Sequence, residues 1–386
     1  MMKKGPKNTL ILGFLVNPIA GMGGRVGLKG TDGMYEKALE LGAKPVSPKR
    51  AVEFLKSLSR YKDELEVTLI TCPGQMGEEE AKEAQFDFEL IDMPKKERTG
   101  PEDTKLAVSK FVDKNVELIV FVGGDGTARD VMDALRSKNS NIPVLGVPSG
   151  VKMYSGIFAI NPQVAAEVIA YFAENKANVM ELEVMDIDEE AFRKNELKIK
   201  LYGYMKTPYV PMAIQGSKSV TPNTIDEHEN QLAIARYIID RIKEDLDPDG
   251  YYILGPGTTV KTINDLLGIE KTLLGVDIYH KGKVYLDVNE RQILEIVKDF
   301  KKAWIIVSPI GHQGMIFGRG NQQISPEIIK RVGKDHIIVI ATMRKIRDLA
   351  DGALKVDTGD PEVDNMLRGY IKVLVDYQTW RMVKVI

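Results

Sequence analysis

The chain reads Val116-Glu117-Leu118-Ile119-Val120-Phe121-Val122-Gly123-Gly124-Asp125-Gly126-Thr127. The apolar run before Gly123 has the length and composition of a strand that is buried on both faces. The glycines after it leave backbone N–H groups open to a ligand, because no side chain blocks the approach. Apolar residues then recur at helical spacing. The stretch therefore predicts a strand, an anion-binding turn and a helix, which is the repeating unit of an α/β protein.

Strand and helix patterns alternate on both sides of this stretch. Strand-like runs lie at 9–16, 65–71, 86–91, 116–122 and 143–147, with helical segments between most of them. This order predicts a doubly wound, mostly parallel sheet. After residue 180 the pattern becomes mixed and β-rich, and it closes with a helix followed by a terminal strand. We therefore predict an α/β fold with two domains, residues 1–180 and 181–386. Two outcomes stay open for the carboxyl end, which either remains in the second domain or returns to the first.

Composition excludes several classes of protein. The 386 residues include 53 basic and 55 acidic side chains, a net charge of -2, which gives no global attraction to nucleic acid or to an anionic membrane. No apolar run approaches the roughly 20 residues that a membrane-spanning helix needs. Cys72 is the single cysteine, so no intramolecular disulfide can form. These features predict a cytoplasmic protein without a membrane span.

An aspartate inside an anion-binding turn requires an explanation, because its carboxylate alone would repel phosphate. Asp125 either positions, through water, a Mg²⁺ that neutralises the phosphates, or it removes the proton of an attacking hydroxyl. The alternative is a sharp turn in which Asp125 only caps the helix. Three glycines around one acid favour the functional interpretation.

Two further turns are predicted to reach the same edge of the sheet, where open α/β folds bind their ligands. One follows the first strand, and the other follows the strand at 143–147. The Lys152 ammonium would offset phosphate charge there, or it is a solvated lysine at a helix start. The predicted phosphate-binding set is Asn17, Gly21, Gly123, Gly124, Gly126, Thr127, Ser149, Gly150 and Lys152.

The second half carries two polar, glycine-containing regions. The first, Gly255 to Thr259, follows a strand and opens a helix, so its N–H groups and hydroxyls suit a phosphate or a ribose; an ordinary capped helix start is the alternative. In the second, the guanidinium of Arg319 suits bidentate phosphate binding. A polar loop between domains is the alternative there. The predicted substrate-binding set is Gly255, Gly257, Thr258, Thr259, Arg319, Asn321 and Gln322. For His312 two roles stay open, a further substrate contact or an ordinary surface or structural histidine.

The turn at 123–127 resembles the signature of the superfamily that joins NAD kinases with diacylglycerol and sphingosine kinases. Asn17-Pro18-Ile19-Ala20-Gly21 is similar to its first-strand element. Over most of its length the chain is similar to the predicted ATP- or polyphosphate-dependent NAD kinases related to acetoin-catabolism X proteins, through 146–152, 274–277, 318–325 and 356–360. The resemblance implies phosphoryl transfer from ATP or polyphosphate to the 2′-hydroxyl of the adenosine ribose of NAD. It also implies Asp125 as the catalytic residue, Mg²⁺ or Mn²⁺, and a homo-oligomer.

The sequence departs from that family at one point. Established NAD kinases carry an Asn-Glu pair between the aspartate turn and the threonine turn, and this chain has no clear counterpart. Two other functions therefore stay open. One is a kinase for another hydroxyl compound, such as a lipid-like alcohol or a sugar. The other is a non-catalytic regulator that binds NAD or ATP.

Overall fold

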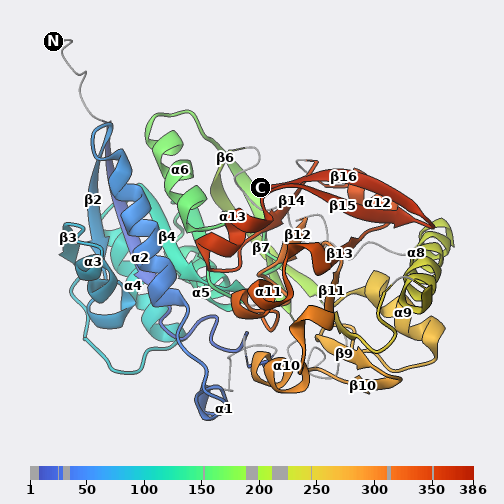
Figure 1. Cartoon of the computed structure of the whole chain (residues 1–386). Coiled ribbons are helices and arrows are strands. Elements are labelled where there is room, and N and C mark those ends of the chain that lie inside the picture. Colours follow the sequence, from blue (N-terminus) through green and yellow to red (C-terminus); the bar gives the residue numbers. More distant parts are fainter. Residues whose placement is uncertain are drawn as a thin grey trace.

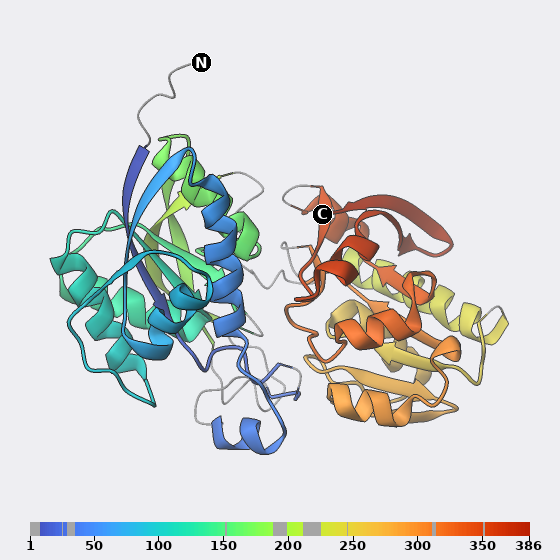
Figure 2. The same ribbon diagram turned by 60° about the vertical axis from the view of Figure 1, so that its left-hand side comes forward.

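The computed structural model describes residues 8–24, 26–28, 35–150, 153–187, 199–210, 225–244, 246–310, 314–349 and 352–386. Within them the chain forms two units that stand side by side, each built around its own sheet (Figures 1 and 2). Helices accompany both sheets, which confirms the predicted α/β class.

The first unit is built on a five-stranded parallel sheet with the strand order β3-β2-β1-β4-β5. Helices α2 and α6 pack together over one face, and α4 and α5 pack together over the other. The elements are β1 (Asn8–Val16), α1 (Tyr35–Glu40), α2 (Ser47–Leu58), β2 (Leu65–Thr71), α3 (Glu78–Glu83), β3 (Phe88–Leu90), α4 (Pro101–Asp113), β4 (Leu118–Gly123), α5 (Asp125–Ser137), β5 (Val144–Pro148) and α6 (Pro162–Ala173).

Strand β4 shows why the central run is continuously apolar. All of its residues are buried, and successive side chains enter different cores. Val120 and Val122 pack on the side of α2 and α6, whereas Ile119 and Phe121 pack on the side of α4 and α5. A strand covered by helices on both faces has no solvent side, so the usual alternation of polar and apolar residues disappears.

A two-stranded antiparallel hairpin, β6 (Asn178–Ile187) and β7 (Ile199–Tyr209), packs against α5. The Tyr202 hydroxyl donates to Asp133 at 2.7 Å, and a Cβ on Gly203 would lie 3.0 Å from the Met132 methyl carbon. The predicted division near residue 180 assigns this hairpin to the second domain. Its contacts instead favour a division after Val210, and we propose that boundary.

The second unit is a nine-stranded mixed sheet with the order β10-β9-β8-β11-β13-β15-β16-β14-β12. Helices α8 and α9 cover one face, and α10, α11 and α13 pack on the other. The elements are α8 (Ile225–Glu244), β8 (Tyr251–Leu254), α9 (Thr258–Leu267), β9 (Asp277–His280), β10 (Lys283–Tyr285), α10 (Glu290–Ile296), β11 (Ala303–Val307), β12 (Met315–Phe317), α11 (Pro326–Val332), β13 (Ile337–Ile340), α12 (Met343–Arg347), β14 (Ala353–Val356), α13 (Pro361–Leu367), β15 (Gly369–Asp376) and β16 (Thr379–Val385).

The carboxyl end stays in this second sheet. Strands β15 and β16 form an antiparallel hairpin, where the sequence predicts a single terminal strand. The reversal occurs around Gln378, whose φ of 52° is the left-handed conformation that a tight turn uses. The residues at the reversal, 376–379, include neither glycine nor proline, so the local pattern does not mark the turn.

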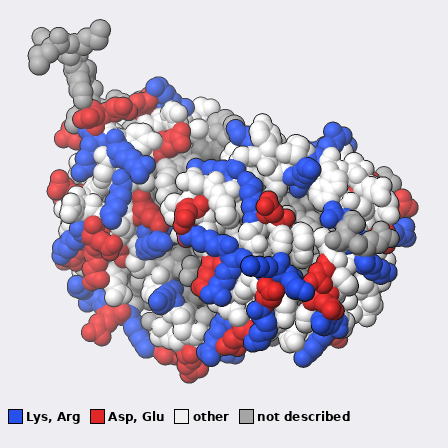
Figure 3. All heavy atoms as spheres, in the orientation of Figure 1, with Lys and Arg blue, Asp and Glu red and all other residues white. Residues whose placement is uncertain are grey.

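Charged residues connect the two units. Arg50 of α2 donates to the Asp357 carboxylate at 2.8 Å, and Lys49 donates to the Gly359 carbonyl at 3.1 Å. On the face shown in Figure 3, positive and negative side chains are intermixed, in keeping with the near-zero net charge. Among the described helices, none is both long and apolar enough to cross a membrane.

Candidate functional site

The turn Gly123–Thr127 links the carboxyl end of β4 to the first turn of α5. A Cβ on Gly123 would lie 2.5 Å from Thr127 Oγ1, so packing requires glycine there. Gly124 and Gly126 are partly exposed, whereas Asp125 and Thr127 are buried. Because the first N–H groups of a helix have no partner within it, this helix start favours an anion.

The structure brings the three predicted turns of the first unit together. Asn17 Nδ2 donates to Thr127 Oγ1 at 2.9 Å, and the Ser149 N–H donates to the Gly123 carbonyl at 3.0 Å. Gly21 has a φ of +81°, and a Cβ there would lie 1.9 Å from the Ser149 carbonyl oxygen. A Cβ on Gly150 would lie 3.1 Å from the Cα of Gly124. The predicted phosphate-binding residues therefore share one edge of the sheet, except Lys152, which lies outside the described residues.

Asp125 is 7% exposed, and its carboxylate accepts two backbone N–H groups. Oδ2 accepts from Tyr154 at 2.7 Å and Oδ1 from Ser155 at 3.1 Å. Burial raises the pKa of Asp125 to about 6, while the hydrogen bonds from Ser155 and Tyr154 act in the opposite direction. A carboxylate can accept about four hydrogen bonds. With the Ser155 hydroxyl as a third donor, Asp125 is held in place and keeps capacity for one more.

The threonine turn of the second unit lies at the carboxyl edge of the other sheet. Gly257, with a φ of +114°, precedes the first turn of α9, and the Gly255 N–H donates to the Ile306 carbonyl of β11 at 2.9 Å. Gln231 of α8 reaches the Thr258 hydroxyl at 3.4 Å. The hydroxyls of Thr258 and Thr259 therefore stand at a helix start next to the ends of parallel strands.

Lys345 is a residue of this edge that the sequence did not single out. Its ammonium donates to Thr259 Oγ1 and to Ser308 Oγ, both at 3.0 Å. Burial lowers the pKa of Lys345 to about 8, and the charge of Glu227 opposes that shift. Within the described ranges no ion pair joins it to a carboxylate. Lys345 lies on α12, just after β13, so parallel pairing of β8, β11 and β13 brings it to the threonine turn.

The predicted residues of the 319–322 region have three different surroundings. Arg319 is buried and donates through Nη2 to the carbonyls of Ala159 and Ile160 in the first unit. Both ends of the Asn321 amide are used by its own loop, at 3.1 Å from the Gly318 N–H and 2.8 Å from the Ile316 carbonyl. Asn321 therefore positions the loop. Gln322 Oε1 would lie 1.6 Å from a Cβ on Gly24, so it packs on the first unit. His312 lies outside the described residues.

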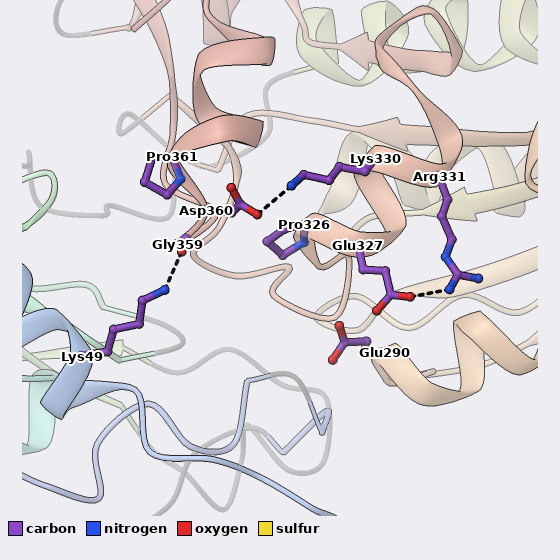
Figure 4. A pocket seen from close by; sticks show the side chains of 9 residues that line it. All are labelled: Lys49, Glu290, Pro326, Glu327, Lys330, Arg331, Gly359, Asp360 and Pro361. Carbon is purple, nitrogen blue, oxygen red and sulfur yellow. Dashed lines mark hydrogen bonds and ion pairs between the residues drawn. The ribbon is translucent and has the colours of Figure 1, made fainter.

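A cavity of 450 Å³ opens beside the junction of the two units (Figure 4). Its lining combines Lys49 of α2 with Glu290, Pro326, Glu327, Lys330, Arg331, Gly359, Asp360 and Pro361. Each of its cations already has a partner: Lys49 bonds Gly359, Lys330 bonds Asp360 at 3.1 Å, and Arg331 bonds Glu327. The cavity thus offers paired charges and no ready anion site.

The described part of the chain contains no group of three His, Cys, Asp or Glu side chains that would hold a metal ion by itself. Asp125 is an acid at the predicted phosphate-binding edge, and two amides already donate to its oxygens. Magnesium is commonly held by one or two carboxylates together with substrate phosphates and water. The residues therefore fit a Mg²⁺ that arrives with a phosphate donor, and Asp125 would hold it through water.

Two models of a known protein family match the sequence of this chain. The ATP-NAD kinase N-terminal domain matches residues 12–177, and the ATP-NAD kinase C-terminal domain matches residues 248–385. The chain belongs to the ATP-NAD kinase family. This membership confirms the predicted resemblance to NAD kinases.

Two of the solved structures that match this chain are only distantly similar to it. A protein assigned as a diacylglycerol kinase from Bacillus anthracis str. Sterne is 15% identical with a TM-score of 0.24, and the match covers 46% of this chain and 45% of that one. A protein assigned as a UDP-N-acetylglucosamine 2-epimerase from Listeria monocytogenes is 10% identical with a TM-score of 0.25, over 93% of this chain and 82% of that one. This chain thus spans less than half of the first. No curated protein sequence matches it.

Proposed function

We propose that this chain transfers a phosphoryl group from ATP or polyphosphate to the 2′-hydroxyl of the adenosine ribose of NAD, giving NADP. One observation carries the proposal: the Asp125 carboxylate lies where three turns meet at the carboxyl edge of the first sheet. Family membership supplies the reaction class. Carboxyl edges of open parallel sheets are the usual ligand sites of such folds.

The residues divide between donor and acceptor. The backbone N–H groups at the start of α5 would bind the phosphates of the donor, and the Asn17–Thr127 hydrogen bond holds the neighbouring turn against them. The second unit would bind NAD through the hydroxyls of Thr258 and Thr259. The Lys345 ammonium would meet the negative charge of its pyrophosphate. Catalysis of this kind depends mainly on positioning and on charge neutralisation.

The proposed reaction is an attack of the ribose hydroxyl on the donor phosphate. The 2′-hydroxyl oxygen forms a bond to the terminal phosphorus of the donor while its proton passes to the Asp125 carboxylate. The bond from that phosphorus to the bridging oxygen breaks, and its electron pair leaves with ADP or with the shortened polyphosphate. A general base works best when its pKa lies near the working pH. The Asp125 pKa of about 6 meets that condition. Mg²⁺ or Mn²⁺, when bound with the donor, neutralises phosphate charge.

A regulatory role is the second candidate function, and one observation favours it. Asp125 is 7% exposed and bonds two amides, which is also how a purely structural aspartate is placed. A regulator would bind NAD or ATP without transferring phosphate. A kinase for a lipid-like alcohol or a sugar is the other alternative, and the missing Asn-Glu pair keeps it open.

The decisive experiment is mass spectrometry of products after incubation with ATP or polyphosphate, Mg²⁺ and NAD. Asp125→Asn should lower kcat by about 10²- to 10⁴-fold, because general-base catalysis typically contributes that much. One amide of Tyr154 or Ser155 would then face the asparagine NH₂ group, which costs about 1–3 kcal/mol of stability. Asp113→Asn is the matched control, since that carboxylate at the end of α4 is 56% exposed.

Each outcome selects one function. NADP from the wild type and from Asp113→Asn, but not from Asp125→Asn, supports the proposal. Full turnover in Asp125→Asn refutes the role of this residue. Binding of NAD without any product supports the regulator, and phosphorylation of another alcohol in a screen of acceptors supports the alternative kinase.

The setting of the enzyme is also a proposal. We infer a cytoplasmic location, because the single cysteine, Cys72, is buried and free. We also infer a homo-oligomer, because the family resemblance implies one. Size-exclusion chromatography with light scattering measures the oligomeric state directly.

A further inference from the structure

Arg319 is a buried charge carried by a rigid loop of the second unit. It is 5% exposed. Its neighbour Gly318 has a φ of +109°, and a Cβ there would lie 2.1 Å from the Asp357 carbonyl oxygen. The Asn321 amide joins both sides of the loop. The guanidinium therefore cannot swing freely, and the loop aims it across the junction into the first unit.

Only part of the guanidinium is used. Nη2 donates to the carbonyls of Ala159 and Ile160, but Nε and Nη1 are buried with no hydrogen-bond acceptor among the described residues. The nearest paired carboxylate, Asp357, is 3.9 Å from Nη2 and already accepts from Arg50 at 2.8 Å. Leaving charged donors buried without acceptors is costly, so an arrangement of this kind indicates a missing anion.

The position of Arg319 relates it to the aspartate turn. The carbonyls that hold its Nη2 belong to the segment that follows Tyr154 and Ser155, whose amides hold Asp125. Burial lowers the pKa of Arg319 to about 10, with the charge of Asp125 among those acting against the shift. Arg319 therefore stays protonated at neutral pH, and its two free donors lie within the electrostatic reach of Asp125.

We propose that Nε and Nη1 of Arg319 donate to the terminal phosphate of the donor bound at the turn Gly123–Thr127. The second unit would thus supply a charge-neutralising guanidinium to phosphoryl transfer that is otherwise organised by the first unit. The ligand class is a chain of three or more phosphates, as in ATP or inorganic polyphosphate. This inference rests on the proposed donor site but does not require NAD as the acceptor.

The test compares ATP with ADP, because only ATP carries the phosphate in question. Calorimetry with Mg²⁺ measures binding of ATP, ADP and inorganic tripolyphosphate to the whole chain. Arg319→Gln should weaken the binding of ATP and tripolyphosphate by about 10- to 100-fold and that of ADP by much less, because charge-assisted hydrogen bonds to phosphate are lost. Arg319→Lys keeps the charge but loses the planar guanidinium, so its affinity for ATP should lie between those of the wild type and Arg319→Gln.

Arg331→Gln is the matched control, since Arg331 belongs to the same unit but pairs with Glu327 and its side chain is 49% exposed. It should leave the ratio of ATP to ADP affinity unchanged. Equal losses for ATP and ADP in Arg319→Gln, or no loss, overturn the inference; if that variant fails to fold, an unchanged ratio in Arg319→Lys does the same. A wild type that binds neither ATP nor tripolyphosphate overturns both proposals. If ATP binding depends on Arg319 but no NADP forms, only the proposal that NAD is the acceptor is refuted.

Discussion

Replacing Gly21 by alanine tests directly whether the turn after β1 packs against the Ser149 turn at the candidate site. Gly21 has a φ of +81°, and the added Cβ would lie 1.9 Å from the Ser149 carbonyl oxygen. A left-handed L-residue costs about 1–2 kcal/mol on backbone grounds alone. The contact requires the Ser149 turn to move by about 1 Å, a displacement comparable to those that cost about 10²-fold in rate when catalytic groups shift.

Gly42 provides a control with the same backbone strain. Its φ is +80°, and a Cβ there has no neighbour within 4 Å. Gly42→Ala should therefore lose only about 1–2 kcal/mol and keep full turnover. Gly21→Ala should lose a further 1–3 kcal/mol or so, the usual cost of overpacking, because its Cβ meets backbone that flexible side chains cannot relieve.

The assay has two readouts on both variants. Urea unfolding gives the free energy of unfolding, and the rate of phosphoryl transfer from ATP gives kcat. A drop of about 10²-fold in kcat for Gly21→Ala alone is the expected result. If the two variants lose equal stability and both keep full activity, the first-strand turn does not pack against Ser149 in the working enzyme, and the composite site is wrong.

Further predictions concern the titration of Asp125 and Lys345. Because burial raises the pKa of Asp125 from 3.8 to about 6, kcat/KM should rise tenfold per pH unit up to about pH 6 and then level off. The stability that this residue contributes should be largest below pH 3.8 and be lost as pH rises through 6, and urea unfolding across that window checks the sign. A bound pyrophosphate should raise the pKa of Lys345 from about 8, so NAD binding at pH 8 should take up a proton, which calorimetry in buffers of different ionisation enthalpy detects. Lys345→Met should abolish that proton uptake and weaken the binding of NAD by about 10- to 100-fold. Lys261→Met is the control, because Lys261 pairs with Asp265 on α9, and it should change neither quantity.

The first unit could be predicted from sequence because its signals are local. Doubly buried strands are continuous apolar runs, and their turns carry glycine where backbone passes close to backbone, as at Gly21 and Gly150. Parallel pairing then fixes which turns share an edge. The proposed sharing of Asn17, Thr127 and Ser149 follows from that rule, and their hydrogen bonds agree with it.

The remaining features depend on contacts that no local pattern records. Lys345 reaches Thr259 across 86 residues of sequence, and only the strand order of the second sheet brings them together. Asn321 looks like a ligand-binding amide in sequence, but its own loop uses both of its ends. The hairpin β6–β7 joins the first unit through packing on α5, which its alternating pattern cannot specify.

The buried charges at the junction are best understood as determinants of geometry. A buried ion pair such as Arg50–Asp357 gives little net stability, since desolvation roughly cancels the attraction. Its geometric effect is large, because Asp357 also contacts the loop of Arg319 through its carbonyl and Arg50 belongs to α2, beside the Ser47–Ser149 hydrogen bond. The pair therefore ties the guanidinium of the second unit to the phosphate-binding edge of the first. On this reasoning, Asp357→Asn should weaken ATP binding, measured by calorimetry, and should also cost about 3–5 kcal/mol of stability, because the Arg50 guanidinium is left buried without its partner.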